Sequence, residues 1–236
     1  MSSPQSDGKS RPIPNALTIA GVDPSGGAGI LADVKAMSAL GAYGCAIIAA
    51  LTAQNTQGVT GISPVPPAFV GLQIDTLFTD VRIDAVKIGM LGQRPVIEVV
   101  AEKLAKWAPA HVVLDPVMVA KSGDLLLEKE AVGAMREAML PQATLLTPNL
   151  PEAGVLLEER PVETVKEMRR VAERLRNKLA HSGERWVLVK GGHLPGNETI
   201  DLLHDGDRMI ELPGHRIETC LLYTSPSPRD QRGARM

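Results

Sequence analysis

Cysteine is scarce in this sequence, because Cys45 and Cys220 are the only two among 236 residues. Two cysteines suggest neither a disulfide framework nor a zinc site, and they favour a reducing, cytoplasmic compartment. An excess of charge of one sign is also lacking, since the net charge is −2 and the isoelectric point is near 6.2. Such a chain has no general basic surface for nucleic acid or an anionic membrane, so any phosphate site must be local.

Long apolar runs are lacking as well. The longest uninterrupted run, Cys45 to Leu51, is far shorter than the roughly 20 residues that cross a bilayer. Residues 1–15 are rich in Ser, Pro and Lys without an apolar core segment, so they fit neither a secretory signal nor a membrane anchor. We expect a disordered leader at 1–15, followed by one soluble domain at 16–219.

Strand and helix patterns alternate through that domain, which predicts an α/β fold. Helix patterns lie at 30–40, 67–78, 95–107, 129–140 and 163–179, and short apolar strand patterns lie at 16–20, 45–51, 85–88, 112–114, 144–147 and 186–189. This alternation is typical of a mostly parallel sheet with helices on both faces. The turn signal Asp205-Gly206, between apolar segments 200–203 and 209–212, predicts an antiparallel hairpin at one sheet edge.

A glycine-rich loop, Gly21 to Gly29, joins the first predicted strand to the first predicted helix. Glycine permits positive φ, and it lets backbone N–H groups approach a ligand closely at a helix N-terminus. The loop matches neither the P-loop, since no Gly-Lys-Ser/Thr follows, nor the G-x-G-x-x-G pattern. On local chemistry alone, ligand contact and a purely structural turn are equal alternatives.

Polar residues follow the predicted strands, at the edge where open α/β sheets bind ligands. Asp33 lies one helical turn beyond the loop and can face the same opening, although a solvated helix charge is the simpler interpretation. Gln54 ends the second strand, and its amide offers an acceptor and two donors in one plane. That arrangement suits the ring nitrogen and amino group of an aminopyrimidine, but a loop-capping role for Gln54 is an equal alternative.

Three further positions after strands carry charge or an amide. Asp115 follows the strand at 112–114, and Asn149 and Glu152 follow the strand at 144–147. The two carboxylates are candidates to hold Mg²⁺ through waters, as at many nucleotide-phosphate sites. The alternative for Glu152 is a first-turn charge stabilised by the helix dipole. Lys190 is either a phosphate contact or an ordinary charge after a strand.

Six segments, taken in order, resemble one known family. They are ALTIAGVDPSGGAGILADVKAMSALGAYG (16–44), ALTAQNTQGV (50–59), DVRIDAVKIGMLG (80–92), VVLDPVMVAKSGDLLL (112–127), LLTPNLPEA (145–153) and VLVKGGHL (187–194). The resemblance is to the hydroxymethylpyrimidine/phosphomethylpyrimidine kinases of thiamine biosynthesis, which are members of the ribokinase-like superfamily. It covers residues 16–219 and implies a three-layer ribokinase-like fold.

The resemblance also implies an activity and a set of site residues. The expected reaction moves the γ-phosphoryl group of ATP to 4-amino-5-hydroxymethyl-2-methylpyrimidine and then to its monophosphate. By resemblance, Gly21, Asp33, Gln54, Met90 and Val117 form the pyrimidine pocket. Asn149, Glu152 and Lys190 belong to the nucleotide and phosphate region, and Asp115 with Glu152 to an Mg²⁺ site. Phosphoryl transfer requires mainly positioning and charge neutralisation, which these groups would supply.

The resemblance ends at Thr219. There the family continues with a segment like N-T-H-G-T-G-C, whose glycines form an anion hole and whose Cys lies where related kinases place the catalytic base. Residues 220–236 look instead like translated adapter DNA joined to a gene fragment, so Cys220 is not that cysteine and we assign no catalytic residue. We expect a truncated chain without the final helices, inactive in transfer and prone to aggregate through uncovered apolar faces.

Two other functions compete with this interpretation. A pyridoxal kinase of the same superfamily would phosphorylate a hydroxymethyl group on a similar flat ring, and Met90 is the residue that favours the pyrimidine kinases. A non-catalytic pyrimidine-binding protein would keep the pocket without the catalytic segment. The resemblance also makes a homodimer plausible, and no nucleic-acid or membrane partner is expected.

Overall fold

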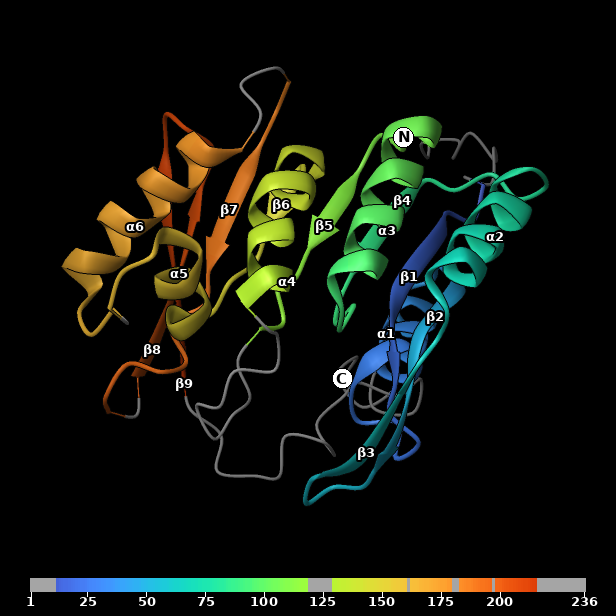
Figure 1. The fold of residues 1–236 in the computed structure, drawn as a ribbon. Coiled ribbons are helices and arrows are strands. Elements are labelled where there is room, and N and C mark those ends of the chain that lie inside the picture. Colours follow the sequence, from blue (N-terminus) through green and yellow to red (C-terminus); the bar gives the residue numbers. More distant parts are fainter. Residues whose placement is uncertain (1–11, 119–128, 161, 180–182, 197, 216–236) are drawn as a thin grey trace, which may run out of the picture.

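The computed structural model describes residues 12–118, 129–160, 162–179, 183–196 and 198–215. These residues form one α/β unit (Figure 1). The strands are β1 (Asn15–Val22), β2 (Tyr43–Gln54), β3 (Val59–Pro64), β4 (Ala85–Ile88), β5 (Val112–Leu114), β6 (Leu145–Leu146), β7 (Trp186–Val189), β8 (Glu198–His204) and β9 (Met209–His215). The helices are α1 (Gly29–Ala39), α2 (Pro67–Phe78), α3 (Arg94–Trp107), α4 (Lys129–Ala134), α5 (Leu150–Leu157) and α6 (Val165–Lys178).

All nine strands form one sheet in the order β3-β2-β1-β4-β5-β6-β7-β8-β9. The strands from β2 to β7 in this order are parallel, and β3, β8 and β9 add antiparallel edges. The chain first moves from β1 to β2 and then returns to the other side of β1 at β4. Right-handed crossovers therefore place α1 on one face of the sheet and α2 to α6 on the other. The predicted mostly parallel sheet with helices on both faces is confirmed.

One edge of the sheet was predicted from the sequence and the other was not. The hairpin predicted around Gly206 is present as β8 and β9, and it is longer than the apolar segments indicated. Strand β3 was not predicted, and it pairs with the last residues of β2 so that the two project beyond the rest of the sheet (Figure 1). The described β3 residues are exposed along their whole length, so no buried face marks them in the sequence.

The predicted helices are present with small changes at their ends. The pattern at 129–140 is α-helical up to Ala134, continues as a π-helical turn over Met135–Met139 and ends in a 3-10 turn over Leu140–Gln142. Pro141 lies in that last turn, where its missing N–H cannot continue the helix. Leu40, which the helix pattern at 30–40 includes, follows the last residue of α1 and is 80% exposed.

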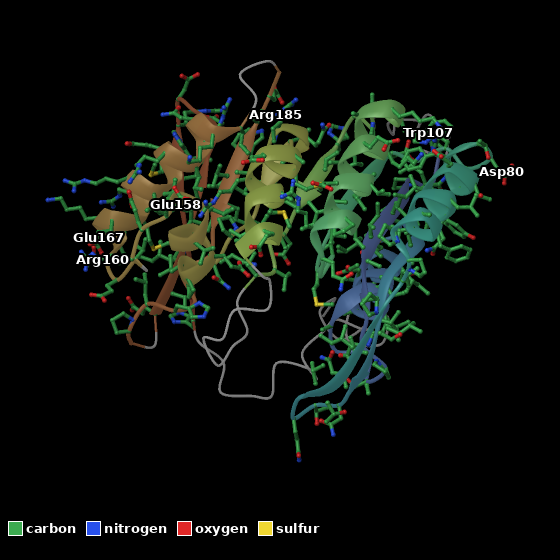
Figure 2. All side chains as sticks on the ribbon, viewed as in Figure 1. Asp80, Trp107, Glu158, Arg160, Glu167 and Arg185 are labelled. Atoms are coloured by element: carbon green, nitrogen blue, oxygen red, sulfur yellow. The ribbon has the colours of Figure 1, made fainter. Side chains whose placement is uncertain are left out.

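Sequence-local capping explains where α5 and α6 begin. The Thr164 hydroxyl accepts a hydrogen bond from the backbone N–H of Glu167, and the Glu167 carboxylate accepts one from the N–H of Thr164. This capping box satisfies donors that would otherwise lack a partner. Arg160 also contacts Glu167, with 2.7 Å between Nη2 and Oε1, and both side chains lie near the beginning of α6 in Figure 2.

The main core lies between the sheet and the α2-to-α6 layer. Strand side chains such as Ile19, Ile88 and Leu114 are fully buried there, together with helix residues such as Ile74 and Ile97. The opposite face carries the row Thr18, Lys87, Val113 and Leu145 across four paired strands, and among these only Thr18 is fully buried. None of the described helices is long and apolar enough to cross a membrane.

Candidate functional site

A cavity of about 420 Å³ opens beyond β1, where the strand order reverses. Such reversal points, outside the carboxyl ends of parallel strands, are where open α/β sheets bind ligands. The lining comes from the ends of β1 and β2, the loop before α1, α1 itself, β3, and the segments after β4 and β5. The lining residues are Ala20, Gly21, Val22, Asp23, Gly27, Ala28, Gly29, Ala32, Asp33, Thr52, Gln54, Val59, Ile62, Lys87, Met90, Asp115 and Val117.

Two glycines make close contacts in the cavity wall possible. The N–H of Gly21 donates to the carbonyl oxygen of Met90 at 3.1 Å, and a Cβ on Gly21 would lie 2.8 Å from Cε of Met90. A Cβ on Gly29 would lie 2.2 Å from the carbonyl oxygen of Gly21, and Gly29 has a φ of +58°. A side chain at either position would push the Met90 wall or the loop out of place.

The glycine-rich loop uses its own backbone donors. The carboxylate of Asp23, only 2% exposed, accepts hydrogen bonds from the N–H groups of Ser25, Gly27 and Ala28 and from the Ser25 hydroxyl. The N–H of Gly26 donates to the carbonyl oxygen of Asp23. An aspartate side chain thus binds these donors and shapes the loop, which is the structural alternative, while loop residues such as Gly27 and Ala28 also line the cavity.

Asp33 takes part in a polar cluster under the cavity. Its Oδ2 accepts from the Thr18 hydroxyl at 2.6 Å and from the Lys87 ammonium at 2.9 Å. The Asp33 and Lys87 side chains are 19% and 23% exposed, and both line the cavity. The simpler interpretation of Asp33 as a solvated helix charge is therefore wrong. Sequence reasoning missed Lys87, although a lysine between the apolar residues Val86 and Ile88 was a visible signal.

Gln54, the last residue of β2, also lines the cavity. A register irregularity between Ala53 and Gln54 precedes the β2–β3 turn, and Gln54 pairs with Val59 of β3. The Oε1 atom of Gln54 lies 3.2 Å from the Thr52 hydroxyl, which also lies 2.8 Å from the carbonyl oxygen of Val22. Thr52 thus links the Gln54 amide to β1. Val59 of β3 also lines the cavity, so the unpredicted strand forms part of the cavity wall.

Asp115 lies at the far end of the cavity and is held by a lysine. Its Oδ1 is 2.9 Å from Nζ of Lys190, and their side chains are 25% and 38% exposed. These residues are 75 positions apart in the chain and meet because β5, β6 and β7 are neighbours. The Thr147 hydroxyl lies 3.4 Å from the same carboxylate oxygen. Sequence analysis treated Asp115 and Lys190 separately, and the fold makes them an ion pair.

Glu152 has a structural role of its own at the beginning of α5. The Asn149 side chain accepts from the N–H of Glu152 at 2.8 Å, and the Glu152 carboxylate accepts from the N–H of Asn149 at 2.8 Å. Burial raises the pKa of Glu152 to about 7, against the lowering effects of the Asn149 N–H, the Lys190 charge and the Met118 N–H, while the Asp115 charge raises it further. Glu152 therefore lies in the first helical turn, as the alternative expected, but burial disfavours its charge. The Asp115 charge acts on this buried carboxyl.

The donor set can be tested against Mg²⁺. No group of three or more His, Cys, Asp and Glu side chains within the described ranges is arranged to hold a metal ion. Two carboxylates remain, Asp115 and Glu152, and the Asp115 charge raises the pKa of Glu152. Mg²⁺ commonly uses only one or two protein carboxylates, with waters and substrate phosphates as its other ligands. The residues present fit a shared site of that kind.

The five predicted pyrimidine-pocket residues are brought together in one cavity. Gly21, Asp33, Gln54, Met90 and Val117 all line it, as does the predicted metal ligand Asp115. The predicted phosphate residues Asn149, Glu152 and Lys190 do not line the cavity. Lys190 and Glu152 are connected to it through Asp115. The predictions for the tail at 220–236 lie outside the described residues.

Comparison with known proteins gives one consistent family. The model of a family described as phosphomethylpyrimidine kinase matches residues 23–222. The hydroxymethylpyrimidine/phosphomethylpyrimidine kinase of Escherichia coli is 52% identical over 201 residues, which are 84% of this chain and 74% of that protein. A thiamine biosynthesis bifunctional protein of Geobacter sulfurreducens is 47% identical, over 87% of this chain and 41% of that protein.

Solved structures agree with the sequence relatives. A phosphomethylpyrimidine kinase from Clostridium difficile superposes with a TM-score of 0.78 and 36% identity, covering 94% of this chain and 92% of that one. A Bacillus subtilis pyridoxal kinase in an ADP complex superposes with a TM-score of 0.79 and 31% identity, covering 94% and 85%. The matched family model spans most of the chain, including every predicted site residue except Gly21, and this chain therefore belongs to the phosphomethylpyrimidine kinase family.

Proposed function

We propose that this protein is an ATP-dependent kinase for 4-amino-5-hydroxymethyl-2-methylpyrimidine and its monophosphate, in thiamine biosynthesis. The observation that carries the proposal is the single cavity that joins the Gln54 amide, the Asp33 carboxylate and the Met90 wall to Asp115 at its far end. Its relatives are named as kinases of this substrate pair. A flat heterocycle with polar edges fits such a mixture of apolar wall and few polar groups.

Different cavity residues would contact different parts of the substrate. The Gln54 amide would pair with a ring nitrogen and the amino group, because it presents an acceptor and donors in one plane. The apolar side chains of Met90 and Val117 would pack on the ring. The Asp33 carboxylate accepts but does not donate when ionised, so it suits a donor on the substrate such as the hydroxymethyl group. A substrate hydroxyl held near the Asp115 end of the cavity would be oriented for phosphoryl transfer.

The nucleotide would bind on the Asp115 side of the cavity. A Bacillus subtilis pyridoxal kinase of the same fold was solved with ADP, which supports use of ATP here. We propose that Lys190 contacts a phosphate group and that Asn149 lies near it at the beginning of α5. Asp115 and Glu152 would hold Mg²⁺ through waters, and the ion when bound would neutralise phosphate charge. A homodimer and a cytoplasmic location stay predictions.

Binding and turnover of the full 236-residue chain test the proposal. Titration calorimetry with the aminopyrimidine should show binding, and Gln54→Leu should weaken it about 10- to 100-fold, since a site built to hydrogen-bond a ligand loses that much with its partner group. Gln57→Leu is the matched control, because Gln57 lies in the exposed β2–β3 turn outside the cavity lining. Equal loss in both variants, or no binding by the unmodified chain, would refute the proposed pocket.

Two alternatives have distinct outcomes in the same experiment. Tighter binding and faster turnover of pyridoxal than of the aminopyrimidine would identify a pyridoxal kinase, the activity named for several structures of the same fold. Binding of the aminopyrimidine without ADP formation in the presence of ATP and Mg²⁺ is the result expected from the sequence for a chain without the catalytic segment, and it would leave this chain a non-catalytic pyrimidine-binding protein. Formation of ADP and phosphorylated pyrimidine supports the kinase.

A further inference from the structure

Lys87 occupies an unusual place for a charged side chain. It lies in the middle of β4, between Val86 and Ile88, both of which are fully buried. Its own side chain is 23% exposed. Removing an ammonium group from water costs several kcal/mol unless it is paired, and an apolar pair of similar size often gives equal or better stability. A purely structural role is therefore a weak explanation for a lysine at this position.

The surroundings of Lys87 hold its ammonium against Asp33. Lys87 is the register partner of Thr18 in β1, so both side chains point to the face that carries α1. Gly89 lies two residues after Lys87, just past the end of β4. A Cβ there would lie 2.9 Å from Nζ of Lys87 and 3.0 Å from the Cβ of Ala20. The absence of a side chain at Gly89 makes the room that the ammonium occupies.

Both donors in the cluster reach the same oxygen of Asp33. The Thr18 hydroxyl and the Lys87 ammonium are 2.6 Å and 2.9 Å from Oδ2, whereas no hydrogen bond from the described residues reaches Oδ1. Asp33 lines the cavity. Two donors on one carboxylate oxygen restrict rotation of the group. The other oxygen is then a fixed acceptor for a donor in the cavity.

We propose that Lys87 is a positioning residue for substrate recognition: it fixes Asp33 through Oδ2, so that Oδ1 accepts a hydrogen bond from a hydroxyl or amino group of the heterocycle. Lys87 would act through Asp33 and not on the transferred phosphoryl group. This inference rests on the proposed function, because it assumes that the ligand of the cavity is an aminopyrimidine with such donors.

A double-mutant cycle separates action through Asp33 from direct or general effects. The dissociation constant of the aminopyrimidine is measured by calorimetry for the unmodified chain, Lys87→Met, Asp33→Asn and the double variant, and ADP affinity is measured for each. Lys87→Met should weaken pyrimidine binding about 10-fold or more, as expected for loss of a charge-assisted hydrogen bond. In the Asp33→Asn background the same change should alter binding by less than about twofold, and ADP affinity should stay constant.

Lys103→Met is the matched control, because Lys103 forms an equally close ion pair with Asp75 away from the cavity, with side chains 18% and 29% exposed. It should leave pyrimidine affinity unchanged. Should Lys87→Met fail to fold, Gly89→Ala displaces the ammonium while keeping both charges, and it should weaken pyrimidine binding in the same direction.

The possible failures are distinguishable. Unchanged pyrimidine affinity in both Lys87→Met and Gly89→Ala, or additive losses in the double variant, would overturn the role of Lys87 while leaving the proposed function intact. A parallel loss of ADP affinity would indicate general damage and would also overturn it. No pyrimidine binding by the unmodified chain would refute the proposed function and, with it, this inference.

Discussion

Replacing Glu152 with glutamine should stabilise the protein above neutral pH. Glu152 is 3% exposed, and its pKa is raised from 4.5 to about 7, chiefly because burial disfavours the charged form. Relative to a carboxyl with an unshifted pKa, this lowers the free energy of unfolding by about 3 kcal/mol at pH 8. Glutamine avoids this cost, and its amide oxygen can still accept the N–H of Asn149 in the capping box.

The sign of the pH dependence follows from the raised pKa. Between pH 4.5 and about 7 the folded state retains a proton on Glu152 that the unfolded state has lost. The contribution of Glu152 to stability is therefore fully present below pH 4.5 and is lost as the pH rises through about 7. The free energy of unfolding of Glu152→Gln should exceed that of the unmodified protein by less than about 1 kcal/mol at pH 5 and by about 3 kcal/mol at pH 8.

Urea unfolding of both proteins at pH 5 and pH 8 measures this difference directly. A gain of about 3 kcal/mol corresponds to a rise of about 6–12 °C in melting temperature for a chain of this size. Glu167→Gln is the matched control, because Glu167 holds the same capping-box position in α6 but has a lowered pKa, mainly through the Glu163 N–H. That variant should lose stability at pH 8, and the loss should shrink as the pH falls.

A constant stability difference between pH 5 and pH 8 for Glu152→Gln would refute the reasoning, because it would show that the carboxyl does not ionise at a cost in the folded state. The same variant should have weaker Mg²⁺-dependent nucleotide binding if Glu152 has the proposed metal role. A residue that lowers stability while supporting binding is common at functional sites.

Two further substitutions test contacts that hold the site together. Gly191→Ala should lower the free energy of unfolding by about 3 kcal/mol, because the added Cβ would lie 1.9 Å from the carbonyl oxygen of Ile200. The control is Gly192→Ala, in which the added Cβ meets nothing within 4 Å. Equal urea midpoints for the two variants would contradict this contact. Gln73→Leu should cost about 1–3 kcal/mol, because the Gln73 amide binds both the N–H and the carbonyl oxygen of Ile48 at the open edge of β2. Amide hydrogen exchange at Ile48 should then accelerate, and unchanged exchange would contradict that role.

The sequence by itself determined the order of elements and the rim of the site. Apolar periodicity marks buried strands and helices, because side chains repeat every 2 or 3.6 residues and only one face or stripe is buried. The positions at or just after the strand ends, such as Gly21, Gln54 and Asp115, could be named as site residues, because parallel strands end at one edge of a sheet. Local pairs such as Asn149 with Glu152 are also readable, since a capping box needs only three residues of spacing.

Tertiary structure alone decided which of those residues contact one another and how deeply they are buried. Lys190 and Asp115 form an ion pair only because the sheet places β5 and β7 on either side of β6. Strand β3 has no buried face, so its pairing with β2 left no period in the sequence. The raised pKa of Glu152 depends on burial, and the contact of Lys87 with Asp33 depends on strand register and the space at Gly89. Burial and contact between distant segments arise from the packed chain and have no local signature.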